Sequence, residues 1–259
     1  MNKVFYFDID GTLLPHGNKE LSTETKYALK ELIRLNYTVF IATGKHQTVA
    51  QTLGNELGIK NYITTNGQQV HMNDKLIYEQ KFSLDEIKKI RIILEENNCT
   101  LGLQNYNSNY VLNNDNIDVD LINGCFHSVS LPTPEICEDV VEDNILQLLI
   151  FGRGKKNVVL DDKYKMFHWH DVGGDILPTE SSKANGIKQV KHLFKGYTSY
   201  AFGDGDNDIE MFNVVDHSVA MGNANDKVKS NARHVTTNDI DHGVYEFLVT
   251  NNIINAIGE

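Results

Sequence analysis

The sequence predicts an α/β protein in which a parallel sheet carries helices on both of its faces. Short apolar runs alternate with amphipathic stretches in the first third of the chain and again near its end. The middle instead holds one helix-like stretch and several short strand-like runs, which is the pattern of an α+β unit. We therefore expect an α/β core formed by residues 1–80 and 182–259, with an α+β unit at 81–181 inserted into it.

Strand-like and helix-like stretches alternate in the first third of the chain. Runs rich in β-branched and aromatic residues predict strands, and stretches whose apolar residues recur at helical spacing predict helices. In chain order we expect a strand at 4–7, a helix at 22–36, a strand at 37–43, a helix at 47–57 and a strand at 61–67. Such alternation builds βαβ units, and these units form a parallel sheet.

The rest of the chain holds two further patterns. Ser83-Leu84-Asp85-Glu86 is a capping box, which predicts a helix that begins there and continues to about Asn97. Short strands should follow at 100–104, 110–114, 126–131, 145–152 and 165–170. The alternation then returns, with helices at 183–195 and 208–215 and strands at 199–202, 217–221 and 233–237.

Charge and composition narrow the class of partner. The 259 residues include 24 Lys and Arg against 35 Asp and Glu, which gives a formal charge of −11. This acidic balance argues against a non-specific nucleic-acid binder or an anionic-membrane binder. An anionic ligand must therefore be attracted by local positive groups. The longest apolar run, near 145–151, is far shorter than the roughly 20 residues that span a bilayer.

Cysteine usage and the first residues predict a cytoplasmic protein. Cys99, Cys125 and Cys137 lack CxxC spacing, so we expect reduced thiols rather than disulfides or a zinc site. The first apolar run stops at Asp8, which is too early for the apolar region of a signal peptide.

Two acidic clusters lie where predicted strands end. Asp8 and Asp10 follow the first strand, and GDGDND at 203–208 follows the strand at 199–202. Ligands of open α/β sheets bind beyond the carboxyl ends of the strands. Carboxylates two positions apart point the same way, and their repulsion is tolerated when a cation lies between them or one acid stays protonated. Converging carboxylates without His or Cys partners predict a hard-cation site, most naturally for Mg²⁺.

Other interpretations of these clusters fit less well. A helix N-cap explains one acid, such as Asp206 or Asp208, but not Asp8, Asp10 and Asp204 together. The second cluster begins like a calcium loop, but the glycine and the glutamate that such a loop requires are absent from their positions. Its two glycines give only half of a dinucleotide-binding fingerprint, and acids beside a pyrophosphate would be repulsive.

Four motifs resemble, in their order, those of the haloacid dehalogenase superfamily. They are DIDGT at 8–12, ATG at 42–44, SSKANGI at 181–187 and GDGDND at 203–208. The insert between the second and third motifs resembles the C2-type cap of the Cof-like phosphatases. Further signatures similar to that group are WHDVGGDILP at 169–178, MGNA at 221–224 and VTTNDIDHGV at 235–244. The resemblance spans essentially the whole chain and implies a Rossmann-like parallel-sheet core with the α+β insert as its cap domain.

The resemblance implies phosphoryl transfer through an aspartyl-phosphate. Asp8 would attack phosphorus as a carboxylate nucleophile. Asp10 would protonate the leaving alkoxide and later deprotonate the attacking water. Mg²⁺ would be held by a carboxylate oxygen of Asp8, the backbone carbonyl of Asp10 and the carboxylate of Asp204.

Other residues of the motifs would bind the phosphate, again by resemblance. Thr43, the backbone N–H groups near Gly44, and Lys183 would hold phosphate oxygens, and a lysine suits a phosphate as a point charge. Asn207 would donate to the phosphate. Asp208 would orient Lys183 or a metal-bound water.

The second motif departs from the family's pattern at the residue after Gly44. The family's second motif commonly continues Thr-Gly-Arg, whereas this chain has Lys45, which keeps the charge but loses the bidentate fork.

His168 and His170 lie two apart without a third ligand, so we expect structural or substrate-facing roles rather than zinc binding. We expect Trp169 between them to pack in a core.

We therefore expect a Mg²⁺-dependent phosphatase of the Cof-like group that acts on a small phosphorylated metabolite, with sugar phosphates as the leading class. The alternatives are nucleotide or cofactor phosphates, such as flavin mononucleotide or pyridoxal phosphate, and a phosphomutase. A non-catalytic binder is disfavoured because it would be expected to have lost Asp8 or Asp10. We expect neither nucleic acid nor a membrane among the partners.

Overall fold

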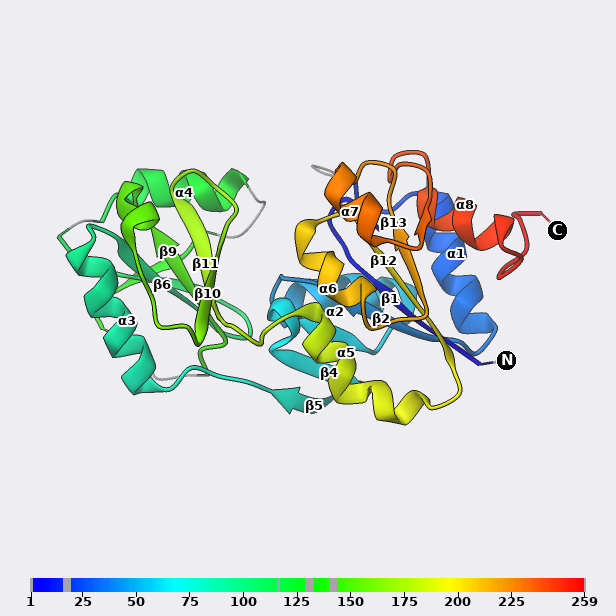
Figure 1. Cartoon of the computed structure of the whole chain (residues 1–259), viewed down its shortest axis with the longest axis horizontal. Coiled ribbons are helices and arrows are strands. Elements are labelled where there is room, and N and C mark those ends of the chain that lie inside the picture. The colour runs from blue at the N-terminus through cyan, green and yellow to red at the C-terminus, as the bar shows by residue number, and fades with distance from the viewer. Residues whose placement is uncertain (1, 16–19, 116, 129–132, 140–143, 259) are drawn as a thin grey trace. The chain divides into compact units, whose positions relative to one another are not determined.

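The computed structural model describes every residue except 1, 16–19, 116, 129–132, 140–143 and 259. The chain forms two compact units, which Figure 1 shows. One unit joins Met1–Glu79 to Ser182–Glu259, and the other is Gln80–Ser181. Each unit has its own sheet and its own apolar core.

The larger unit is built on an eight-stranded sheet. Its strands are β1 (Lys3–Phe7), β2 (Thr38–Ala42), β3 (Tyr62–Thr64), β4 (Gln69–Met72), β5 (Lys75–Glu79), β12 (Thr198–Gly203), β13 (His217–Ala220) and β14 (His234–Val235). They lie in the order β14-β13-β12-β1-β2-β3-β4-β5, and all pairs from β14 to β3 are parallel. This parallel core confirms the predicted α/β class.

The strands β4 and β5 form an antiparallel hairpin at one edge of this sheet, which the sequence patterns above did not reveal. Asn73 and Asp74 connect the two strands, and both have left-handed backbone angles, with φ of 51° and 60°. Asn and Asp tolerate this conformation, and a two-residue turn of this kind matches the twist of the strands that it joins. The signal for the hairpin was therefore the Asn-Asp pair between two short runs.

Helices cover both faces of the sheet, as the alternation predicts. On one face lie α1 (Thr23–Arg34), α2 (Gln47–Leu57) and α8 (Gly243–Thr250), and on the other lie α5 (Lys183–Lys191), α6 (Ile209–Phe212) and α7 (Asp226–Asn231). Successive side chains of a strand point to opposite faces. Accordingly, Phe5 and Phe7 of β1 pack under the first group of helices, whereas Val4 and Tyr6 pack under the second.

The helix boundaries follow from local chemistry. Ser22 precedes α1, and its side chain accepts a hydrogen bond from the backbone N–H of Thr25. Gly58 ends α2 in the left-handed conformation, which glycine adopts without strain. The predicted helix at 183–195 ends earlier as an α-helix and continues as a 3₁₀ turn at His192–Phe194. The predicted helix at 208–215 is reduced to a 3₁₀ turn at Asp206–Asp208 followed by α6.

The smaller unit is an α+β structure with a six-stranded sheet. Its elements are α3 (Leu84–Glu96), β6 (Thr100–Gln104), β7 (Asn109–Leu112), α4 (Val119–Ser128), β8 (Glu135–Cys137), β9 (Gln147–Phe151), β10 (Tyr164–His168) and β11 (Gly173–Pro178), with a 3₁₀ turn at Arg153–Asn157. The strands lie in the order β10-β11-β9-β6-β7-β8. The capping box at the start of α3 is present, with both hydrogen bonds between Ser83 and Glu86.

The predicted strand at 126–131 is wrong for its first residues, because the helix α4 extends to Ser128. Residues 129–131 lie outside the described part of the chain. Ile122, Cys125 and Phe126 are buried together, and their spacing of three and four residues is that of one helix face. Asp118 begins the helix, since its carboxylate accepts from the backbone N–H of Leu121 at 3.0 Å. The helical period at 122–126 was therefore overlooked.

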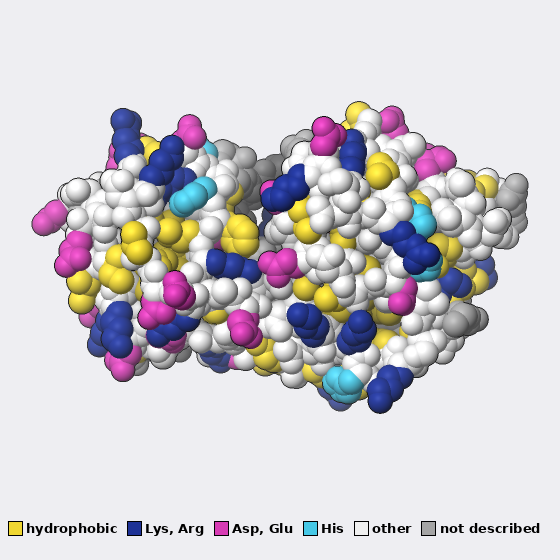
Figure 2. Space-filling view, viewed as in Figure 1, with side chains coloured by type: hydrophobic (Ala, Val, Ile, Leu, Met, Phe, Trp, Pro, Cys, Tyr) yellow, Lys and Arg dark blue, Asp and Glu magenta, His cyan; other side chains and the backbone are white. Residues whose placement is uncertain are grey.

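Charged side chains of both signs lie on the surface of both units. Figure 2 shows Lys and Arg side chains interspersed with Asp and Glu side chains in both units on the face that is drawn. Among the described residues, no helix has both the length and the apolar character that crossing a membrane requires.

Candidate active site

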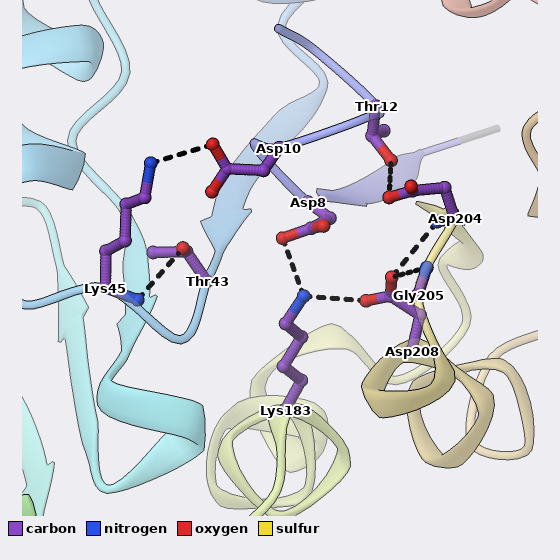
Figure 3. Close-up of polar contacts among 9 residues, drawn as sticks. All are labelled: Asp8, Asp10, Thr12, Thr43, Lys45, Lys183, Asp204, Gly205 and Asp208. Atoms are coloured by element: carbon purple, nitrogen blue, oxygen red, sulfur yellow. Dashed lines mark hydrogen bonds and ion pairs between the residues drawn. The ribbon is translucent and has the colours of Figure 1, made fainter. Parts of the chain in front are cut away.

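The carboxyl ends of three neighbouring strands bring predicted site residues to one edge of the larger sheet. Asp8 follows β1, Thr43 follows β2 and Asp204 follows β12. These strands are consecutive in the parallel sheet, so their ends meet at the same edge. Figure 3 shows the acidic and basic side chains of this edge pointing toward one another.

A buried lysine joins two of the acids. Lys183 Nζ lies 2.6 Å from Asp8 Oδ1 and 2.7 Å from Asp208 Oδ1. The side chains of Lys183 and Asp208 are 1% and 0% exposed, and that of Asp8 is 10% exposed. Lys183 is the first residue of α5, and the preceding Ser182 caps the helix by accepting from the backbone N–H of Asn185. The cap fixes where the helix begins, and therefore where the ammonium group lies.

Burial and charge shift the pKa values within this group. Burial raises the pKa of Asp8 to about 8, although Lys183 acts in the opposite direction. For Lys183, burial alone would lower the pKa, but the carboxylates of Asp208 and Asp8 outweigh it and raise the pKa of the ammonium group. Lys183 therefore stays charged, whereas Asp8 needs a further cation nearby to be a carboxylate at neutral pH.

Asp208 is held by the backbone of its own loop. Its Oδ2 accepts from the N–H groups of Asp204 and Gly205 at 3.1 and 3.0 Å. A Cβ atom at Gly203 would lie only 2.4 Å from Asp208 Cγ, so the loop can approach the strand only because residue 203 is glycine. With three hydrogen bonds already made, Asp208 is fixed beside Lys183.

Three carboxylates form a group that suits a metal ion. Asp8, Asp204 and Asp208 each offer one oxygen, and these oxygens lie within 4.8 Å of one another. No other group of three or more His, Cys, Asp or Glu side chains in the described part of the chain has such a geometry. The histidines on either side of Trp169 therefore belong to no such group. An all-oxygen set of this kind suits Mg²⁺ or another hard cation.

Asp10 points to a different partner. Its carboxylate oxygen lies 2.7 Å from Lys45 Nζ, so the side chain of Asp10 is turned toward the loop after β2 (Figure 3). Gly11 has a φ of 74°, which glycine adopts without strain, and its N–H donates to the carbonyl of Leu14 at 2.7 Å. The strand β1 ends at Phe7, and the side chains of Asp8 and Asp10 contact different lysines, whereas on a regular strand they would point the same way.

The predicted phosphate-binding residues occupy contrasting environments. Thr43 is 1% exposed, and its hydroxyl accepts from the backbone N–H of Lys45 at 3.1 Å. Gly44 lies between these two residues. Asn207 is exposed, and it lies in the 3₁₀ turn that also carries Asp208.

Two residues near Asp204 were missed by sequence reasoning. Thr12 Oγ1 donates to Asp204 Oδ1 at 3.4 Å, and Asn223 Nδ2 lies 3.3 Å from Asp204 Oδ2. The same amide of Asn223 donates to the carbonyl of Gly11 at 2.8 Å, so it ties the loop after β1 to the loop after β12. Thr12 lies in the first motif and Asn223 in MGNA. Both residues therefore belong to motifs that the sequence analysis singled out, but neither was given a role there.

Trp169 packs in the smaller unit, as expected. Its ring meets that of Phe151 at a centroid distance of 6.3 Å, edge to face, and its indole N–H donates to Asp175 at 2.7 Å. His170 Nδ1 lies 3.3 Å from Cys125 Sγ.

The sequence matches a family model along almost its whole length. The model is described as haloacid dehalogenase-like hydrolase, and it matches residues 5–248. The chain belongs to this family. It is similar to a putative phosphatase, YkrA, of Bacillus subtilis (strain 168), with 32% identity over 240 residues, which are 91% of this chain and 92% of the relative. The resemblance inferred from the four motifs is thereby confirmed, and the protein is a haloacid dehalogenase-family phosphatase.

Two further comparisons extend this result. The phosphatase is 27% identical over 285 residues to the 5-amino-6-(5-phospho-D-ribitylamino)uracil phosphatase YwtE of Bacillus subtilis (strain 168), covering 95% of this chain and 96% of the relative. Its structure is similar to that of BT1666, a haloacid dehalogenase-superfamily phosphatase from Bacteroides thetaiotaomicron. The TM-score is 0.86 at 25% identity, with 98% of this chain and 96% of that chain covered.

Proposed function

We propose that this phosphatase hydrolyses a small phosphorylated metabolite with Mg²⁺, through a phosphate ester formed on Asp8. The observation that carries the proposal is the convergence of the carboxylates of Asp8, Asp204 and Asp208, of which Asp8 and Asp208 bond one buried lysine. A nucleophilic carboxylate must be ionised and must approach an anion. Lys183 and a metal ion supply the positive charge that allows both.

In the first step an oxygen of Asp8 forms a bond to phosphorus, and the bond from phosphorus to the leaving oxygen breaks. Asp10 gives its proton to that oxygen, so the product leaves as an alcohol and Asp10 becomes a carboxylate. In the second step Asp10 takes a proton from water, whose oxygen bonds to phosphorus as the bond to Asp8 breaks. Inorganic phosphate leaves, and Asp8 and Asp10 return to their starting forms.

The residues of the site fit Mg²⁺. The carboxylates of Asp8 and Asp204 and the backbone carbonyl of Asp10 would hold the ion, because all three supply oxygen ligands. The raised pKa of Asp8 fits the same assignment, since a bound cation favours the carboxylate form. When bound, the ion would offset the negative charge that builds up as the phosphate meets Asp8.

The phosphate oxygens would be bound on the side of Asp8 that faces Thr43 and Lys183. The Thr43 hydroxyl and the backbone N–H groups near Gly44 would donate to them, and Lys183 would add its charge. Asn207 is exposed beside the site and would donate from the opposite loop. In this assignment Asp208 acts on the phosphate only through Lys183.

A sugar or sugar-alcohol phosphate is the favoured substrate class. The YwtE relative is named for a substrate that carries its phosphate on a ribityl chain. We further propose that the unit at 81–181 is a cap domain that selects the substrate, by analogy with the family, and that the core is formed by 1–80 and 182–259.

The free thiols of Cys99, Cys125 and Cys137 support a reducing, cytoplasmic location.

Phosphate release from a panel of sugar phosphates, nucleotides and cofactor phosphates would test the proposal. We expect release that requires Mg²⁺, stops with chelator and is lost in Asp8→Asn, because an amide is a poor nucleophile. Asp206→Asn is a matched control, since Asp206 is exposed and bonds Asn225 and Lys227 instead. Asp8→Asn activity within a few-fold of wild type would exclude the covalent mechanism.

The same panel separates the alternatives. A phosphomutase would keep the phosphate and return an isomeric sugar phosphate instead of inorganic phosphate. Silence of the folded, Mg²⁺-loaded protein on every compound would favour a mutase or a binding role.

A further inference from the structure

The two acids of the first motif are paired with two different lysines. Lys183 bonds Asp8 from the start of α5, whereas Lys45 bonds Asp10 from the loop after β2 (Figure 3). Among the described residues, Lys45 is the only side chain that bonds the carboxylate of Asp10. Its Nζ lies 2.7 Å from Asp10 Oδ1, and the two side chains are 23% and 44% exposed. The acid that must hand over a proton therefore has a cation of its own.

The backbone of Lys45 is fixed by its neighbours. Its N–H donates to the Thr43 hydroxyl at 3.1 Å, and its carbonyl accepts from the N–H of Thr65 at 2.9 Å. The N–H of Asn66 donates to the carbonyl of Thr43 at 3.2 Å. The hydrogen bonds from Thr65 and Asn66 clamp both ends of the segment from Thr43 to Lys45.

The clamp itself is strained. Thr65 and Asn66 are consecutive left-handed residues, with φ of 51° and 50°. This conformation is rare for a β-branched residue such as threonine, and costs of order 1–3 kcal/mol are typical of such positions. Strain of this kind persists where the surrounding structure enforces it, often at functional sites. The strained pair Thr65-Asn66 therefore fixes the backbone position from which the Lys45 side chain reaches Asp10.

We propose that Lys45 is the positioning residue of Asp10, an inference that rests on the proposed function. The ammonium group of Lys45 donates to Oδ1 of Asp10, so the carboxyl group is held with its proton on the other oxygen, where it can serve the leaving oxygen. As phosphorus bonds to Asp8 and the leaving oxygen takes the proton of Asp10, the new negative charge on Asp10 meets the ammonium group of Lys45. Lys45 itself gives up no proton and forms no bond to the substrate in this step.

This role predicts a dependence on the leaving group. A sugar alkoxide must be protonated as it leaves, whereas p-nitrophenolate is stable as an anion and needs no general acid. The ratio kcat/KM covers all steps up to release of the leaving group, so it excludes the later attack of water. A residue that acts through Asp10 should therefore lower kcat/KM for sugar phosphates far more than for p-nitrophenyl phosphate. A merely structural residue would lower both alike.

The test compares Lys45→Met with wild type on p-nitrophenyl phosphate and on the sugar phosphate that wild type hydrolyses fastest. We expect kcat/KM to fall about 30-fold or more for the sugar phosphate, mainly through kcat, and no more than about 3-fold for p-nitrophenyl phosphate. Lys45→Arg, which keeps the charge, should restore most of the lost activity. Lys26→Met is a matched control, because Lys26 pairs with Glu56 at the same 2.7 Å and similar exposure, away from the site.

Three results would overturn the role of Lys45 while leaving the proposed function intact. They are equal losses on both substrates, no loss on the sugar phosphate, and no recovery in Lys45→Arg. A wild-type protein without turnover on either substrate would instead overturn the proposed function, and the inference with it.

Discussion

Lys183 lies 2.6 Å from Asp8, and both side chains are almost fully buried at the edge of the sheet. The lysine comes from the start of α5 and the acid from the end of β1, 175 residues earlier in the chain. Asp208 shares the same ammonium group at 2.7 Å. Because the charges are inside the protein, this contact matters for stability as well as for chemistry.

Removing Lys183 should therefore lower both the stability of the protein and its phosphatase activity. In Lys183→Met, Asp8 and Asp208 lose their buried partner, and we expect the free energy of unfolding at pH 8 to fall by about 3–5 kcal/mol. Phosphatase activity should fall at least 100-fold, because the phosphate loses a point charge. Urea unfolding and phosphate release measure the two effects. Lys188→Met, an exposed position on the same helix, should change neither. A change in unfolding free energy below 1 kcal/mol would contradict the buried pairing.

Mg²⁺ should stabilise the protein through Asp204. At ten times its Kd, a ligand that binds only the folded state adds about 1.4 kcal/mol of stability, and the melting temperature should rise accordingly. We expect this rise in wild type and in Asp206→Ala, but not in Asp204→Ala. Thermal unfolding with and without the ion is the measurement. An equal rise in all three proteins would place the ion elsewhere.

Asn223 should stabilise the proposed Mg²⁺ site through its hydrogen bonds. Its amide bonds both Asp204 and the carbonyl of Gly11, and its oxygen accepts from the N–H of Asp239 at 3.0 Å. Loss of such a supporting contact typically weakens metal affinity 10- to 100-fold. We expect a shift of about that size for Asn223→Ala in a Mg²⁺ titration followed by calorimetry. Asn213→Ala, at an exposed position, is the control, and equal affinities in the two variants would show that Asn223 has no such role.

A pair of histidines should make stability depend on pH. His217 Nδ1 lies 3.2 Å from His234 Nε2. Burial, and then the charge of Arg233, lower the pKa of His217, while burial, and then His217, lower the pKa of His234. The unfolded chain therefore binds more protons than the folded one below about pH 6.5, so stability should be lost as the pH falls from 7 toward 5.

This loss can be measured by urea unfolding at pH 7 and pH 5. In His217→Phe, which keeps a ring stacked on Tyr200, the fall in stability should be smaller than in wild type. His192→Phe removes an exposed histidine and should leave the fall unchanged. An identical fall in His217→Phe and wild type would show that the pair does not titrate as described.

Much of the larger unit could be read from the sequence because its elements carry strong local signals. The residues of α2 were predicted exactly, since apolar spacing and Gly58 both mark its boundaries. The strand at 126–131 was predicted wrongly where α4 extends to Ser128, because the helical spacing of Ile122, Cys125 and Phe126 was overlooked. The β4–β5 hairpin was missed because the Asn73-Asp74 pair was not recognised as its turn.

The sequence by itself determined the family, the parallel sheet and the acids at its edge, because these depend on local patterns and on motifs in a fixed order. Only the tertiary structure decided which lysine forms an ion pair with which aspartate. Lys45 is near Asp10, and Lys183 is near Asp8, because distant segments of the chain meet where parallel strands end. Contacts between such segments leave no periodic trace in the sequence, and neither does the tie that Asn223 makes between two loops. The pairing of Asp8 with Lys183 and of Asp10 with Lys45 is therefore a property of the fold.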